Sequence, residues 1–169
     1  ADAIGMAVPA SDAAALATWF AEKSDSGSLV EYLKTFDITT GVMQTHEGLA
    51  RVAREFVLDL HADGVIYGEI RWAPEQHLSR GLTLDQTVEA VQEGLEAGAE
   101  EVRHAGGSIR VGQLVSAMRH ADRGLEIAEL AVRHRNNGVV GFDIAGAEAG
   151  FPAGNLRDAF DYLAHHFFP

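Results

Sequence analysis

Residues 64–74 read GVIYGEIRWAP, a run of β-branched and aromatic residues that starts after a glycine and stops before a proline. This composition predicts a strand over residues 65–71. The preceding residues 45–60 carry apolar side chains at helical spacing, and Gly64 occupies the usual position of a left-handed helix cap. A helix that leads directly into a strand is the basic unit of an α/β protein.

The same unit recurs twice toward the C-terminus. Strands are predicted at residues 108–117 and 139–144, and helices are predicted at residues 83–105, at 122–136 and from about residue 155. The sequence Thr83-Leu84-Asp85-Gln86 is a capping box, in which Gln86 can accept a hydrogen bond from the Thr83 amide. This alternation predicts right-handed crossovers and a parallel sheet.

The N-terminal part is predicted to consist of helices. Asp12 can cap a helix that runs through Phe20, and Thr45 can cap the helix that precedes the first strand. Ser28 and Glu31 match a second capping box, which opens a short helix with an apolar stripe. That stripe consists of Leu29, Tyr32, Leu33 and Phe36. It is either core or a lid over a pocket.

Two architectures fit this order of elements, a doubly wound sheet and a (β/α)8 barrel. The doubly wound fold predicts a glycine-rich phosphate turn after the first strand, but Trp72-Ala73-Pro74 follows Arg71. A closed barrel requires about 250 residues, and three parallel strands cannot close. The sequence therefore favours an α/β fold that is a partial (β/α)8 TIM barrel. We expect residues 1–169 to be a single domain, with a helical lid segment at 1–63 and three β/α units at 64–169.

Composition excludes several classes of function. The formal net charge is −12, so the surface would repel a phosphate backbone and nucleic-acid binding is not expected. The chain has no cysteine, which excludes disulfides and thiolate metal sites and is typical of a cytoplasmic protein. No run of about 18 apolar residues is present, so membrane insertion is not expected either.

Chemistry in a parallel α/β fold is carried by the loops at the carboxyl ends of the strands. Arg71 ends the first predicted strand, and we expect it to pair with a carboxylate such as Asp143 inside the curved face of the sheet. Polar residues of these loops, which include His77, His120, Asp143 and Glu148, offer ligand types that zinc accepts. No two of these histidines stand at metal-binding spacing, so hydrogen-bonded loop residues are the favoured interpretation.

Gly146 is the most informative single residue of these loops. It follows the third predicted strand in the run GFDIAGAEAGFP, residues 141–152, which is rich in small residues. Small residues at a strand end allow a ligand to approach the main chain, where an amide can hold a flat heterocycle. A tight turn without a ligand explains the same run equally well.

Four stretches in this order resemble the middle section of the adenosine deaminase family in its bacterial form. They are SLVEYLKTFD (28–37), GVIYGEIRWAP (64–74), MRH (118–120) and VGFDIAGAE (140–148). The resemblance implies a (β/α)8 barrel of the metal-dependent amidohydrolase type with one zinc ion. It also implies a purine nucleoside substrate, with adenosine converted to inosine and ammonia by a zinc-activated water.

The resemblance also implies roles for individual residues. Gly146 matches the glycine whose backbone amide contacts the purine, and Met118 matches a residue of the pocket floor. The stretch from Arg71 to Pro74 matches positions that line or support this floor, and Asp143 is expected beside it. The apolar helix that walls the nucleoside pocket in the family matches Leu29, Tyr32, Leu33 and Phe36.

The family's metal-binding and proton-transferring motifs match nothing in this sequence. The His-x-His pair, the His-Ala-Gly-Glu motif, the later histidine and the aspartate pair would all lie before or after it. No zinc ligand and no catalytic residue is therefore assigned here, and we expect the chain alone to be inactive. A non-catalytic interaction domain derived from a barrel, and deamination of adenine or a modified adenosine, stay open as alternatives. An unrelated phosphate-binding α/β enzyme is a third.

Overall fold

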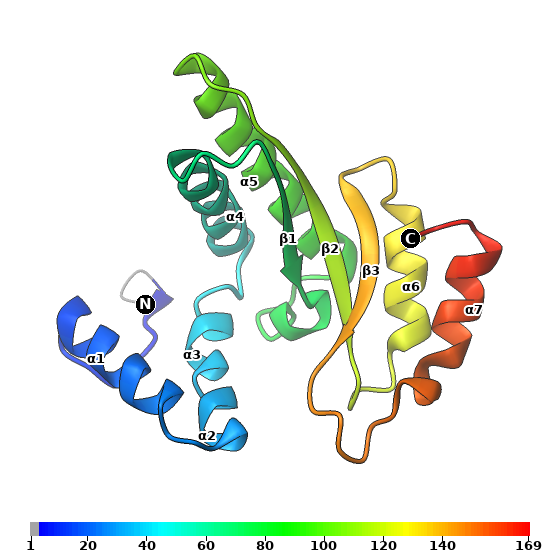
Figure 1. The fold of residues 1–169 in the computed structure, drawn as a ribbon, viewed down its shortest axis with the longest axis horizontal. Helices are drawn as coiled ribbons and strands as arrows, with labels where there is room; N and C mark the ends of the chain where they lie inside the picture. Colours follow the sequence, from blue (N-terminus) through cyan, green and yellow to red (C-terminus); the bar gives the residue numbers. More distant parts are fainter. Residues whose placement is uncertain (1–3) are drawn as a thin grey trace.

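The computed structural model describes residues 4–169, apart from the side chains of Leu29 and Val30. Helices precede and separate three parallel strands, in an α/β arrangement (Figure 1). In chain order the elements are α1 (Ala13–Ser24), α2 (Leu29–Leu33), α3 (Phe36–Gly41), α4 (His46–Ala62), β1 (Tyr67–Trp72), the 3-10 turn η2 (Pro74–His77), α5 (Leu84–His104), β2 (Arg110–Met118), α6 (Gly124–Arg133), β3 (Val139–Ala145), the 3-10 turn η3 (Ala153–Leu156) and α7 (Arg157–His165).

The three strands lie in the order β1-β2-β3, so strands that are consecutive in sequence are neighbours in the sheet. Arg71 lies opposite Leu114, and Met118 lies opposite Ala145. The register shifts once, between Gln113 and Leu114, and this bulge brings Gly141 opposite Leu114. Sequential parallel order is that of a (β/α)8 barrel, and the three predicted strands are confirmed to within two residues at each end.

Helices cover one face of the sheet. Ile70 and Trp72 point toward α4 and α5 and contact the apolar cluster that these helices form, which contains Leu49, Ala53, Val57, Val91 and Leu95. Two glycines bring the helices together, because a Cβ at Gly94 would lie 2.1 Å from the Ala50 carbonyl oxygen and one at Gly98 would lie 2.7 Å from Val57 Cβ. The alternate residues of β1, which include Tyr67 and Arg71, are exposed on the opposite face.

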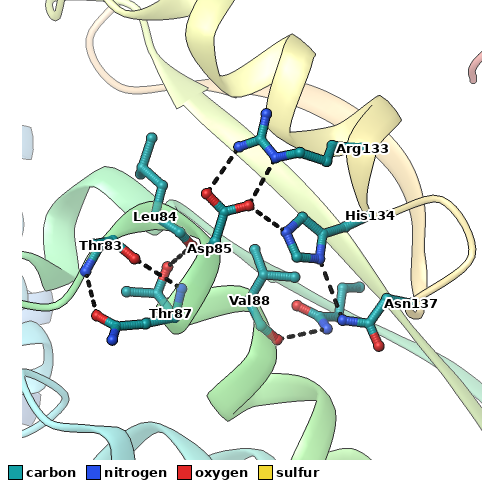
Figure 2. Close-up of polar contacts among 10 residues, drawn as sticks. Thr83, Leu84, Asp85, Thr87, Val88, Arg133, His134 and Asn137 are labelled. Atoms are coloured by element: carbon teal, nitrogen blue, oxygen red, sulfur yellow. Dashed lines mark hydrogen bonds and ion pairs between the residues drawn. The ribbon is translucent and has the colours of Figure 1, made fainter.

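A second cluster joins α5 to α6 and α7 on the same side of the sheet. Its buried apolar members include Val88, Val115, Ile127, Leu130 and Leu163. At its edge, Arg133 donates two hydrogen bonds of 2.8 and 3.0 Å to Asp85, and His134 Nε2 lies 2.7 Å from the same carboxylate (Figure 2). These polar contacts tie the start of α5 to the end of α6.

Most of the predicted caps are present. Thr83 and Gln86 form both hydrogen bonds of the capping box, and Asp12 and Thr45 accept from the amides of Ala15 and Gly48. The capping box predicted at Ser28 is only half formed. Ser28 accepts from the Glu31 amide at 3.4 Å, but the Glu31 carboxylate binds Lys34 Nζ at 2.5 Å. A salt bridge within the helix has replaced the return bond.

The helix predicted to carry the apolar stripe is two short helices, α2 and α3. They are separated at Lys34 and Thr35, where the Thr35 hydroxyl donates to the Tyr32 carbonyl at 2.7 Å. A side-chain hydroxyl that bonds to the backbone competes with the helical ladder, which explains the interruption. α6 is also shorter than predicted, because residues 134–138 form turns rather than a continuation of the helix.

Candidate functional site

The three strands end at one edge of the sheet, where three loops meet. In Figure 1 this edge is the lower one, below the arrowheads of β1, β2 and β3. η2 follows β1, residues 119–123 follow β2, and residues 146–152 follow β3. Parallel strands direct their carboxyl ends to the same side, so residues that are distant in sequence become neighbours there. Met118 contacts Glu75, which is 43 positions away, and lies beside Gly146, which is 28 positions away.

Gly146 has a φ of +101°, a conformation that residues with a side chain rarely adopt. A Cβ at this position would lie 3.3 Å from Met118 Cε and 3.3 Å from His120 Nδ1. The main chain at Gly146 is therefore flanked by a thioether from the last residue of β2 and an imidazole from the loop after it. Glycine is required here for its backbone conformation and, in addition, for the space that Met118 and His120 leave.

Arg119 connects the loops after β2 and β3. Its amide donates to the Ala145 carbonyl at 2.8 Å, directly before Gly146. Its guanidinium donates to the Phe151 carbonyl at 3.3 Å and lies 3.2 Å from a Glu148 carboxylate oxygen. The Arg119 side chain is only 15% exposed, so these bonds hold both ends of the loop that begins at Gly146.

Glu75 connects the loops after β1 and β2. Its Oε1 accepts a hydrogen bond of 2.6 Å from the Met118 amide. Burial raises the pKa of the Glu75 carboxyl, and the bond to Met118 and the positive charges of Arg123 and His120 offset part of this rise. The sequence places Glu75 and Arg119 in these loops without suggesting a role for either. The sequence feature that could have indicated them is a polar residue shortly after a predicted strand.

Arg71 and Asp143 form the predicted pair, with Arg71 Nε donating to Asp143 Oδ2 across β2. This bond raises the pKa of Arg71. The pair lies on the curved face of the sheet, but it is not buried as a pair inside a closed barrel would be, since the Arg71 side chain is 52% exposed and Asp143 27% exposed. The pair lies on the face of the sheet opposite the helices, where a barrel of three strands is open.

The apolar stripe of the N-terminal segment is exposed in this structure. Tyr32 and Phe36 have rings in edge-to-face contact, with centroids 5.5 Å apart, and Tyr32, Leu33 and Phe36 are each about two fifths exposed. The Leu29 side chain lies outside the described residues. Tyr32, Leu33 and Phe36 are therefore not core of this chain, and the interpretation of the stripe as a lid over a pocket stays a prediction.

A network of hydrogen bonds fastens the link between α3 and α4 to the loop after β1. Gln44 Nε2 donates to the Gln76 carbonyl at 2.8 Å, and Gln44 Oε1 accepts from the Ser79 hydroxyl at 2.7 Å. His77 Nδ1 lies 2.8 Å from the Met43 carbonyl oxygen, and burial lowers the pKa of this imidazole. The segment that carries Tyr32 and Phe36 is thereby held near the carboxyl end of β1.

Zinc, which the resemblance implies, requires three or four converging nitrogen, sulfur or carboxylate ligands. Within residues 4–169, no group of three His, Asp or Glu side chains could hold a metal ion. The four candidate side chains have other contacts: His77 with Met43, His120 with Phe151, Asp143 with Arg71, and Glu148 with Arg119. The described residues do not fit a zinc site, and no step of a reaction is assigned through one.

Two hollows of the surface are lined by none of Glu75, Met118 and Gly146. One of about 340 Å³ lies between the start of α6 and the start of α7, and it is lined by acidic side chains that include Asp122, Glu126 and Asp158. Another, of about 440 Å³, lies between α4 and α5. The chemistry-bearing loops instead form an open surface, since the neighbouring strands that would enclose a barrel mouth are not part of this sheet.

The sequence pattern of the adenosine deaminase family matches residues 1–166. The chain belongs to the adenosine deaminase family. It is 60% identical over 156 residues to adenosine deaminase 1 of Streptomyces coelicolor, covering 92% of this chain and 39% of that protein. It is 56% identical to the adenosine deaminase of Mycobacteroides abscessus, covering 92% and 43%. The chain thus spans about two fifths of the length of these relatives.

Similarity to solved structures confirms the fold. The adenine deaminase of Arthrobacter aurescens superimposes with a TM-score of 0.77 at 20% identity, covering 99% of this chain and 49% of that one. A zinc-bound amidohydrolase of Burkholderia ambifaria gives 0.70 at 19% identity, covering 93% and 42%. The Arabidopsis N6-mAMP deaminase gives 0.70 at 30% identity, covering 86% and 45%. The α/β fold is therefore part of an amidohydrolase-type (β/α)8 barrel.

One finding bears on the membrane. No helix among the described residues is long and apolar enough to span a bilayer.

Proposed function

We propose that the complete enzyme containing this chain deaminates adenosine hydrolytically, releasing inosine and ammonia, in a zinc-dependent reaction. The observation that carries the proposal is the main chain at Gly146. Gly146 is exposed at the carboxyl ends of the strands, and it combines a positive φ with two flanking side chains. The 60% identity to the Streptomyces adenosine deaminase supports the same substrate class.

Each named residue has a proposed role in binding rather than in bond breaking. The Gly146 amide would donate to the purine, and the Met118 thioether would pack beside it, since both lie at the same strand edge. Leu29, Tyr32, Leu33 and Phe36 would close over the nucleoside and exclude water. Arg71 and Asp143 would hold β1 and β3 together beneath the pocket.

Zinc, where it is bound, would make hydroxide available near neutral pH for attack on the purine. The ligands and the acid/base glutamate would come from parts of the polypeptide other than residues 4–169. We propose that residues 1–169 form one internal part of the barrel, with 1–63 as the lid segment and 64–169 as three β/α units. We also propose a cytoplasmic location, for which the absence of cysteine is the support.

Deamination of adenine or of a modified adenosine is the rival within the same class. The Arabidopsis N6-mAMP deaminase, at 30% identity, is the specific reason to consider a modified purine. The discriminating experiment measures ammonia release by the purified full-length enzyme from adenosine, adenine and N6-methyl-AMP, together with zinc content. A preference for adenosine of at least tenfold in kcat/KM supports the proposal, and a preference for either rival contradicts it.

A non-catalytic interaction domain is the alternative from another class, and the exposed face of β1 is the observation that favours it. Tyr67 on this face is 53% exposed. Such a domain would form a defined oligomer and would not require further strands. A full-length polypeptide that contains no zinc and releases no ammonia from any of the three purines would favour this alternative.

A further inference from the structure

The carboxylate of Glu75 stands out among the groups to which the proposed reaction assigns no role. It belongs to η2, after β1, and it reaches across to the end of β2, where its Oε1 accepts from the Met118 amide at 2.6 Å. No ion pair of Glu75 occurs within residues 4–169. The nearby Arg123 instead donates two hydrogen bonds, of 2.7 and 3.0 Å, to Glu126. The one direct bond of this carboxylate is to a backbone amide.

Two consecutive backbone amides at the end of β2 donate hydrogen bonds toward opposite neighbouring strands. The Met118 amide donates toward the loop after β1, and the next amide, of Arg119, donates at 2.8 Å to Ala145 in β3. The backbone of residues 118–120 is therefore bound on both sides. Removal of the Glu75 oxygen would leave the Met118 amide without its partner and release one of these two restraints.

The end of β2 determines the space above Gly146. Met118 Cε and His120 Nδ1 are the two atoms nearest to a Cβ built on Gly146, each at 3.3 Å. A shift of a few tenths of an ångström in residues 118–120 would move both atoms toward or away from the Gly146 main chain. Such positional errors near a reacting ligand reduce binding and rate.

We propose that Glu75 is a positioning residue, whose carboxylate oxygen holds Met118 and His120 in place around the purine-binding main chain of Gly146. This inference rests on the proposed function, since it needs a purine at Gly146. The role belongs to the oxygen acceptor rather than to the charge. The groups facing Glu75, namely Arg123, His120 and Glu126, carry both signs, and none forms an ion pair with it.

The test uses the full-length enzyme containing this chain, with adenosine as substrate. Glu75→Ala removes the acceptor and is expected to raise KM roughly tenfold, because a charged acceptor is lost from a partly buried amide. The change in kcat should be smaller. Glu75→Gln keeps an oxygen in reach of the Met118 amide and should return KM to within about threefold of wild type. Recovery by glutamine is what a charge effect would not produce, and a change in KM that exceeds the change in kcat is what a general loss of stability would not produce.

Asp85→Ala is the matched control, since it removes a carboxylate with more hydrogen bonds that lies between α5 and α6 (Figure 2). It should lower the melting temperature and leave KM unchanged. If Glu75→Ala does not fold, Glu75→Asp replaces it, because its shorter side chain withdraws the oxygen from the amide, and KM should rise similarly.

If the wild type is active and Glu75→Ala, or Glu75→Asp in its place, has a KM within twofold of wild type, the positioning role is overturned. The proposed function is then unaffected. Equal damage by alanine and glutamine would also overturn the positioning role, because charge would then be the property that matters. A wild type without zinc and without ammonia release from adenosine, adenine or N6-methyl-AMP would overturn the proposed function, and the positioning role with it.

Discussion

Two carboxylates ten positions apart have opposite environments. Glu75 belongs to what we call the strand-end cluster, formed with Met118, Arg119, His120 and Gly146. Burial raises the pKa of Glu75 there, and no ion pair with another described residue compensates fully. Asp85 belongs to the helix cluster, formed with Arg133, His134 and Asn137. Hydrogen bonds from Arg133 and His134 lower the pKa of Asp85 to about 2.

The difference fits the proposed binding role of the strand-end cluster and a stabilising role of the helix cluster. The helix cluster contains a fully paired charge and a bidentate arginine, the arrangement that joins two helices firmly. The strand-end cluster contains a partly buried carboxylate without an ion pair among the described residues, which costs stability, and a glycine with a φ that other residues rarely adopt. Residues whose local environment or backbone conformation is unfavourable for stability, when they gather at one edge of a sheet, are typical of a functional site. Substitutions in the two clusters should therefore affect different measurements.

Gly146→Val should have the largest effect. In the complete enzyme we expect kcat/KM for adenosine to fall by at least about a hundredfold, through KM, because valine adopts a positive φ poorly and its Cβ would crowd Met118 and His120. Steady-state kinetics measure this loss. Gly150→Val is the control, since Gly150 has a φ of +84° but open space around its Cβ position. A normal KM for Gly146→Val would remove Gly146 from the pocket.

Phe36→Ser should have the next largest effect, about tenfold in KM for adenosine. The loss of an aromatic ring that is now half exposed and in contact with Tyr32 would weaken the proposed cover of the nucleoside. Zinc content, measured by metal analysis, should stay the same. A variant that loses zinc as well would show instead that Phe36 supports the fold.

Asp85→Asn tests the helix cluster through pH. Because the folded pKa of about 2 lies below the ordinary value of 3.8, the pair stabilises the fold fully above about pH 4. This stabilisation is lost as the pH falls toward 2. At pH 7 we expect a loss of about 1 kcal/mol, since the carboxylate is 44% exposed and water screens the pair. Urea unfolding should show wild type and variant converging at low pH, and a constant gap would contradict the assignment.

Arg71→Leu should have the smallest effect on stability, on the order of a few tenths of a kcal/mol, because its ion pair with Asp143 is exposed. In the complete enzyme the same substitution should still lower kcat/KM severalfold, if the pair holds β1 and β3 beneath the pocket. A thermal melt and a kinetic measurement on one preparation separate the two effects. Unchanged fold and unchanged activity together would reject a role for the pair.

Much of the fold could be predicted because its signals are local. The strands at 65–71, 108–117 and 139–144, the cap at Thr83 and the alternation of elements all depend on residues within one turn or one strand of each other. The pairing of Arg71 with Asp143 was predictable too, because side chains alternate along a strand and the carboxyl ends of parallel strands meet at one edge. Its exposure was not, since that depends on which strands are neighbours.

The bond from Met118 to Glu75, which spans 43 positions, and the three bonds of Arg119 to Ala145, Phe151 and Glu148 appear only once β1, β2 and β3 lie in register. No local pattern encodes them, because a carboxylate or guanidinium in a loop has the same sequence signature whether it is solvated or bound. The amino-acid sequence alone thus specified a repeat of strands and helices, with a glycine directly after the third strand. Tertiary structure decided which loops meet there, since only the packing of the sheet brings distant backbone amides within hydrogen-bonding distance.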